Sequence, residues 1–166
     1  TGVNIDLSLK FFRKITGNNA LELGRFGVAN FFFPEDHARY DAAATELVEI
    51  HLNRFELPIF KWRNIPVDHN VINEASRKAQ LPIKQVIFGR PAKLHDASHD
   101  EFEKYIQTVL LNIEADGFTR DELTGFYPLS MSSRTQVYKG RLNSFEVIPY
   151  FTDLYDTDHE INTLFF

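Results

Sequence analysis

One apolar stretch decides the fold: FGVANFFF, from Phe26 to Phe33, which stops at Pro34. Phenylalanine and valine favour strands, and a run of this length and composition predicts a buried strand. Residues 35–55 follow with acids in the first turn and apolar side chains at helical spacing, which predicts a long helix. Its apolar face comprises Ala44, Leu47, Val48, Leu52 and Phe55.

Strands and helices continue to alternate after this helix. The tetrapeptide Ser98-His99-Asp100-Glu101 has the spacing of a capping box, so a helix is expected to begin there and to end at Gly117. Trp62, the single tryptophan, lies on an alternating stretch and is expected to pack near the core beside the long helix. The remaining elements expected in this region are strands at 57–63, 83–88 and 125–131 and a short helix at 74–79.

The order strand, helix, strand, strand, helix, strand is that of the ferredoxin-like split β-α-β module. We therefore predict an α+β fold with such a module at 26–131. Residues 1–25 and 132–166 flank it, and because no linker separates them, 1–166 is treated as a single domain or fragment.

The flanks carry further expected elements. Asp6 is expected to cap a helix that contains Phe11 and Phe12 and ends near Gly17. Strands are predicted at 135–138, with a hairpin around Ser132-Ser133, and at 161–166. The acidic run from Asp153 to Glu160 is expected to be a solvated loop. The apolar end, Phe165-Phe166, suggests a cut strand, so exposed strand edges and self-association are expected.

Composition excludes several classes of protein. The chain has 166 residues, 43% of them hydrophobic, with a net charge of -5 and a pI of about 5.7. The absence of a basic patch argues against a nucleic-acid partner, and no apolar run reaches the roughly 20 residues of a membrane helix. Cysteine is absent, so the chain offers no disulfide, thiolate zinc site or iron–sulfur ligand, which fits a cytoplasmic protein.

The residues that could carry chemistry each have a simpler interpretation. Thr1 could be an N-terminal nucleophile whose own amine acts as base. His95 and His99 have a zinc-like spacing, but a helix that begins after Ser98 leaves His95 in a loop, so a solvated helix entrance is favoured. His51 falls on the apolar helix face and is expected to be packed and hydrogen-bonded. No catalytic, cofactor-binding or metal-binding residue is assigned.

Several stretches resemble the glutaminase domain at the start of the glutamate synthase large subunit. The most specific run extends from Phe126-Tyr127 through Ser132-Ser133-Arg134-Thr135 to Val137-Tyr138-Lys139-Gly140. The other matches, in chain order, are Gly27-Val28 with Phe32, Trp62-Arg63 before Pro66, Pro82 with Gln85, Phe102-Glu103, Ile113-Glu114, and Tyr150 with Asp153-Leu154. The resemblance covers nearly the whole chain in order.

This resemblance implies an internal fragment of a class II glutamine amidotransferase of the N-terminal nucleophile hydrolase type, an αββα sandwich of two sheets. The flanking strands would belong to the hydrolase sheets, and the rest of the amidotransferase domain would be the partner. The resemblance implies flavin and iron–sulfur centres in other domains of the parent protein and no cofactor in this chain. The family's chemistry needs an N-terminal Cys and an Asn-Gly pair. Both are absent here, and Val3-Asn4 stands where the family has Asp-Gly.

Two alternatives stay open from the residues themselves. One is a stand-alone, non-catalytic ferredoxin-like binding or regulatory module. The other is a hydrolase that uses Thr1 as its nucleophile.

Overall fold

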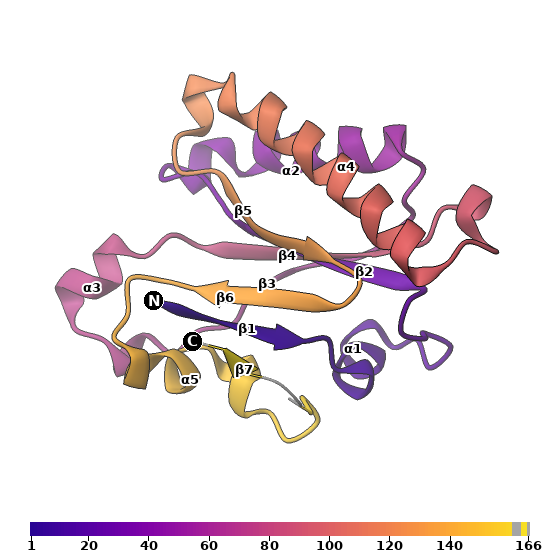
Figure 1. The fold of residues 1–166 in the computed structure, drawn as a ribbon. Coiled ribbons are helices and arrows are strands. Elements are labelled where there is room, and N and C mark those ends of the chain that lie inside the picture. The colour runs from indigo at the N-terminus through magenta and orange to yellow at the C-terminus, as the bar shows by residue number, and fades with distance from the viewer. Residues whose placement is uncertain (161–163, 166) are drawn as a thin grey trace.

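The computed structural model describes residues 1–160 and 164–165. Within them the protein is built from two antiparallel sheets, one stacked below the other in Figure 1, with helices α2 (His37–Arg54) and α4 (His99–Phe118) above the upper sheet. This arrangement confirms the α+β class. Both long helices begin and end within two residues of the predicted positions, and the Ser98 hydroxyl accepts the Glu101 N–H at the start of α4.

The upper sheet has the strand order β3-β4-β2-β5. Its central strand β2 (Phe26–Phe32) pairs antiparallel with β4 (Ile83–Gly89) and with β5 (Tyr127–Ser132), and β3 (Ile59–Asn64) pairs with the far side of β4. Val28 lies opposite Ile87 and Ser132, which fixes the register. Because β2 is covered by helices on one face and by the lower sheet on the other, almost all of its residues are buried.

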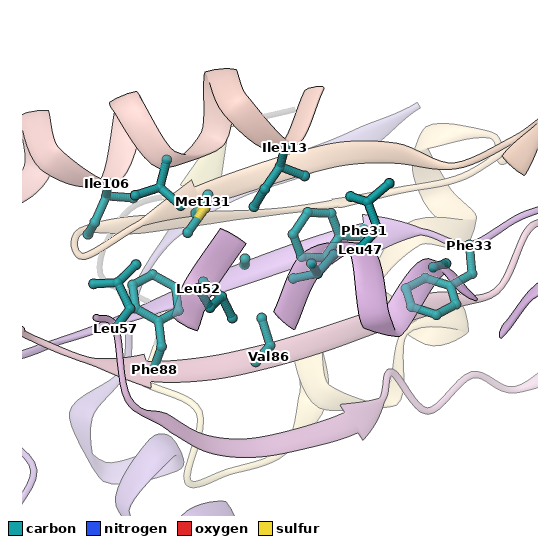
Figure 2. Packing of buried hydrophobic residues seen from close by; sticks show 14 of the residues in the cluster. Phe31, Phe33, Leu47, Leu52, Leu57, Val86, Phe88, Ile106, Ile113 and Met131 are labelled. Carbon is teal, nitrogen blue, oxygen red and sulfur yellow. The ribbon is translucent and has the colours of Figure 1, made fainter. Parts of the chain in front are cut away.

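The two faces of β2 serve different parts of the core. Its odd-numbered side chains, Ala29 and Phe31, belong to the cluster between the sheet and α2 and α4. Figure 2 shows that cluster, with Phe31, Leu47, Leu52, Phe88 and Ile106 filling the space between them. On the other face, Phe26 and Val28 pack with α1 (Leu9–Thr16), whereas Phe32 packs against the cluster that contains Val3 and Ile5. The alternation is the period-two pattern of a strand buried on both faces.

The lower sheet has the order β6-β1-β7 and corrects one prediction. Residues Gly2–Asp6 form strand β1 rather than the approach to a helix capped by Asp6. Val3 and Ile5 point into the core, and β1 pairs with β6 (Thr135–Lys139) and β7 (Leu164–Phe165). The cap of α1 is Ser8, whose Oγ accepts the Phe11 N–H at 3.4 Å, and α1 ends at Gly17 as predicted.

The predicted hairpin around Ser132-Ser133 is wrong. Strand β5 pairs with β2 in the upper sheet, whereas β6 pairs with β1 in the lower sheet. The short connection therefore carries the chain from one sheet to the other, as Figure 1 shows at the right-hand end of β6. A turn alone does not determine pairing, because each strand finds its hydrogen-bond partners in distant segments.

Two short helices, α3 (Glu74–Ala79) and α5 (Val147–Tyr150), complete the fold. The prediction for Trp62 is confirmed: its indole Nε1 donates to Glu49 of α2 at 2.9 Å, and its ring packs edge-on against Phe33. The terminal strand predicted at 161–166 is described only at 164–165, and its other residues lie outside the described part. No helix in the described residues is long and apolar enough to cross a membrane.

Candidate functional site

A buried ion pair joins the upper sheet to the segment after α5. Arg63 of β3 donates to Asp153 Oδ2 through both terminal nitrogens, with Nη1 at 3.0 Å, and the side chains are only 12% and 7% exposed. Tyr138 of β6 donates its hydroxyl to the same oxygen at 2.8 Å. Burial raises the pKa of Tyr138 well above its usual value, so the phenol stays protonated and remains a donor.

This Arg63–Asp153–Tyr138 cluster corrects the prediction that Asp153 to Glu160 is a solvated loop. Asp153 is buried, and its backbone carbonyl accepts a hydrogen bond from His159 Nδ1 at 2.9 Å. The His159 ring is itself buried and stacks on Phe11 at 4.2 Å. Burial lowers the pKa of His159, so the imidazole is neutral at pH 7. Asp156 and Asp158, by contrast, form exposed ion pairs with Lys14.

Three buried side-chain amides lie beside this cluster, between the sheets. Gln85 Nε2 of β4 donates to Asn30 Oδ1 at 2.8 Å and to Gln136 Oε1 at 3.0 Å, and Asn30 Nδ2 donates to the Val137 carbonyl at 3.0 Å. All three are fully buried. The group connects β2 and β4 of the upper sheet to β6 of the lower sheet, so it holds the two sheets in one relative position.

Glu103 of α4 organises the crossing between the sheets. Its carboxylate accepts hydrogen bonds from the Ser132 hydroxyl at 2.6 Å and from the Ser133 N–H at 2.9 Å, and also from the Ser133 hydroxyl. Burial acts to raise the pKa of Glu103, but these hydrogen bonds outweigh it and lower the pKa below its usual value. The carboxylate is therefore ionised and fixes the turn between β5 and β6.

The Nε2 atom of His99 lies 2.9 Å from the Ser133 hydroxyl oxygen. Ser133, His99 and Glu103 therefore have the residue types of a Ser-His-Glu triad. The geometry differs from a triad, because Glu103 contacts the serine rather than the histidine. Ser133 is also buried, with 1% of its surface exposed. The arrangement stabilises a turn and does not present a nucleophile.

The residues considered for chemistry do not converge on one site. The Thr1 amine donates to the Gly140 carbonyl at 2.8 Å. His95 contacts Arg25 at 2.6 Å, away from the contact that His99 makes with Ser133. His51 is buried and lies 2.8 Å from Asp116, as predicted. Within residues 1–160 and 164–165, no three His, Asp or Glu side chains are placed to hold a metal ion.

The polar layer brings together residues from separate stretches of the sequence. Arg63, Gln85, Tyr138 and Asp153 each come from a different stretch that carries the resemblance, and they lie between the sheets. Glu103, from a further such stretch, lies at the connection from β5 to β6. Sequence reasoning did not find the contact between Arg63 and Asp153. Neither position carries a local signal of burial, because Arg63 follows Lys61 and precedes Asn64, and Asp153 opens a run that also contains Asp156 and Asp158.

Comparison with known proteins gives the family. The chain matches the family model of Glutamine amidotransferases class-II over residues 1–166. It is 25% identical over 162 residues to the glutamate synthase [NADPH] large chain of Azospirillum brasilense, a match that covers 96% of this chain and 10% of that protein. It is 30% identical over 159 residues to the corresponding protein of Bacillus subtilis, covering 93% of this chain and 10% of the relative.

A plant relative is similar. The ferredoxin-dependent glutamate synthase 1 of Arabidopsis thaliana is 29% identical over 134 residues, which cover 81% of this chain and 8% of that protein. The chain thus spans about a tenth or less of the length of these relatives. The resemblance seen in the sequence is confirmed, and the chain belongs to the class-II glutamine amidotransferase family.

Proposed function

We propose that this chain is part of the glutamine amidotransferase domain of a glutamate synthase, in which glutamine hydrolysis supplies ammonia for glutamate synthesis. The family match over the whole chain and the similarity to glutamate synthase large chains support the proposal. The partner of this chain is then the remainder of the same amidotransferase domain. We also propose a cytoplasmic location.

The observation that carries the proposal is the buried polar layer between two antiparallel sheets. Such a layer fits a sandwich whose sheets must keep one register, because buried polar groups are costly unless they are paired in one arrangement. The strand order β3-β4-β2-β5 supports a ferredoxin-like module at 26–131, and the separate sheet β6-β1-β7 supports assignment of the flanks to the hydrolase sandwich.

The catalytic groups are proposed to lie outside these 166 residues. An amidotransferase of this type needs a cysteine nucleophile and an oxyanion-binding Asn-Gly pair, and this sequence contains neither. The role of the described residues is to build and hold the sandwich. Without cysteine the chain also has no thiolate for an iron–sulfur cluster, so any such cluster, and any flavin, would be held by other parts of the protein.

The test compares glutamine hydrolysis by the purified 166-residue chain with hydrolysis by the longer polypeptide that carries it. We expect ammonia release from the longer polypeptide, and none above the buffer blank from the chain alone. Loss of a single oxyanion donor already costs about 10²–10³-fold in rate. Ammonia release by the isolated chain would show that its own residues catalyse the reaction. A longer polypeptide that releases no ammonia would favour a non-catalytic module instead.

A further inference from the structure

A cavity of about 270 Å³ opens at the end of the two sheets where α3 lies, on the left in Figure 1. Its floor is apolar: Ile65, Ile83 and Phe151 line it and are buried. The walls come from segments far apart in the sequence, including the start of α2, the end of β3, α3 and the end of β6. Its volume suits a small molecule rather than a macromolecule.

The rim of this cavity is cationic. Arg77 of α3 and Lys139 of β6 line it together with His37 and His69, and no Asp or Glu is among the residues that line it. Within the described part of the chain, neither Arg77 nor Lys139 forms an ion pair with a carboxylate. Arg77 donates one terminal N–H to the His69 carbonyl at 3.0 Å, which leaves its other donors for a ligand. Two cationic side chains therefore line one cavity in a chain of net charge -5.

Acids on the neighbouring elements have other partners. Glu74 at the start of α3 pairs with Lys78 at 3.4 Å, on the exposed surface of that helix. Asp68 accepts the Asn70 N–H at 3.0 Å, and Asp153 pairs with Arg63. Among these acids only Asp68, beside His69, has no cationic partner within residues 1–160 and 164–165, and it forms no ion pair with Arg77 or Lys139. A cleft lined mainly by charges of one sign concentrates counter-ions.

We propose that this cavity binds a small organic anion. Arg77 and Lys139 hold its carboxylate or phosphate group, and the apolar floor takes a short hydrocarbon body. A guanidinium offers paired donors that match either acidic group, and an ammonium adds a point charge. The site is distinct from the buried polar layer, and it does not depend on the proposed amidotransferase function.

The test is protection of Lys139 from an amine-acylating reagent, followed peptide by peptide with mass spectrometry. It is carried out on the 166-residue chain and on the longer polypeptide that carries it. The probes, each at about 10 mM, are butyrate, inorganic phosphate and the neutral analogue butanol. We expect butyrate to slow acylation of Lys139 most, phosphate less and butanol not at all. Lys78, exposed on the same side of the molecule in α3, is the internal control and should be unaffected.

Arg77→Gln should raise the apparent dissociation constant for butyrate about tenfold, since it removes a charge-assisted hydrogen bond. In Arg77→Lys, butyrate should still protect Lys139 in part. In Lys78→Gln, the protection of Lys139 should be fully retained. Stronger protection by inorganic phosphate than by butyrate would also support an anion site and would identify the acidic group as phosphate. No protection by any probe, equal protection of Lys78, or unchanged protection in Arg77→Gln would overturn the proposal. None of these readouts depends on glutaminase activity.

Discussion

Arg63 and Asp153 form a largely buried ion pair between the edge strand β3 and the segment after α5. The two residues are 90 positions apart in the sequence. Tyr138 donates to the same carboxylate oxygen, so three segments meet at one atom. The pair therefore ties the segment after α5 to the upper sheet.

Asp153→Asn should lower the free energy of unfolding by about 3 kcal/mol, because it leaves the Arg63 charge buried without a counter-ion. The measurement is chemical denaturation followed by circular dichroism. The double variant Arg63→Met with Asp153→Leu should lose less free energy of unfolding than the two single variants lose in sum. Asp156→Asn, in the exposed pair with Lys14, is the matched control and should change stability much less. Equal effects at Asp153 and Asp156 would contradict a structural role for the buried pair.

Trp62→Ala should also destabilise the protein, by about 3 kcal/mol. The substitution removes the ring that packs on Phe33 and leaves Glu49 without the indole donor. Trp62→Phe should recover part of the loss, since it restores apolar contact without the hydrogen bond. Phe60→Ala, on the same strand but 44% exposed, serves as the comparison. A change below about 1 kcal/mol in Trp62→Ala would show that the indole contributes little to the core.

Stability should fall as the pH is lowered below 6.5, the ordinary value for histidine, because burial lowers the pKa of His159 in the folded protein. The unfolded chain then binds a proton that the folded chain excludes, so His159 contributes stability in full above that pH and loses it on acidification. His159→Phe keeps a ring against Phe11 and removes the titration. Urea midpoints measured between pH 7.5 and about 5 should decline less in this variant than in the unsubstituted protein. An identical decline of the urea midpoint with pH in the two proteins would contradict the prediction.

Glu103 should affect the pH dependence of stability at lower pH than His159 does. Its pKa lies below the ordinary 4.5 because hydrogen bonds from Ser132 and Ser133 outweigh its burial. The stabilisation it gives is therefore complete above pH 4.5 and is lost as the pH falls through the lower folded-state value. In Glu103→Gln the decline of the urea midpoint below pH 4.5 should be shallower. The double variant Ser132→Ala with Ser133→Ala should also make this decline of the urea midpoint shallower. A decline that is unchanged in both Glu103→Gln and the double serine variant would contradict the prediction.

The sequence predicted the elements with strong local periodicity and missed contacts between distant segments. Strand β2 and helices α2 and α4 were found because their apolar spacing is long and regular. Strand β1 was missed because only five residues alternate, and Asp6 looked like a helix cap. The connection at Ser132-Ser133 looked like a hairpin because local sequence does not reveal that β6 pairs with β1. The sequence around Asp153 predicts a solvated loop because nearby acids dominate the local charge, while its partner Arg63 lies far away in the chain.

The 166-residue chain should self-associate, and the outer edge of β7 is where we expect contact. The other sheet edges carry features that hinder strand addition: Pro128 in β5, the exposed Lys61 in β3, and on β6 the Val137 backbone already bonded to Asn30 and Ser130. Strand β7 pairs with β1 on one side, and no described strand lies on its other side.

Sedimentation velocity over a range of concentrations should therefore show dimers or larger species. Phe165→Lys should shift the distribution toward monomer, whereas Phe145→Lys, at a side chain 77% exposed and outside the strands, should not. A monomer at every concentration, or equal effects of the two substitutions, would contradict association through β7.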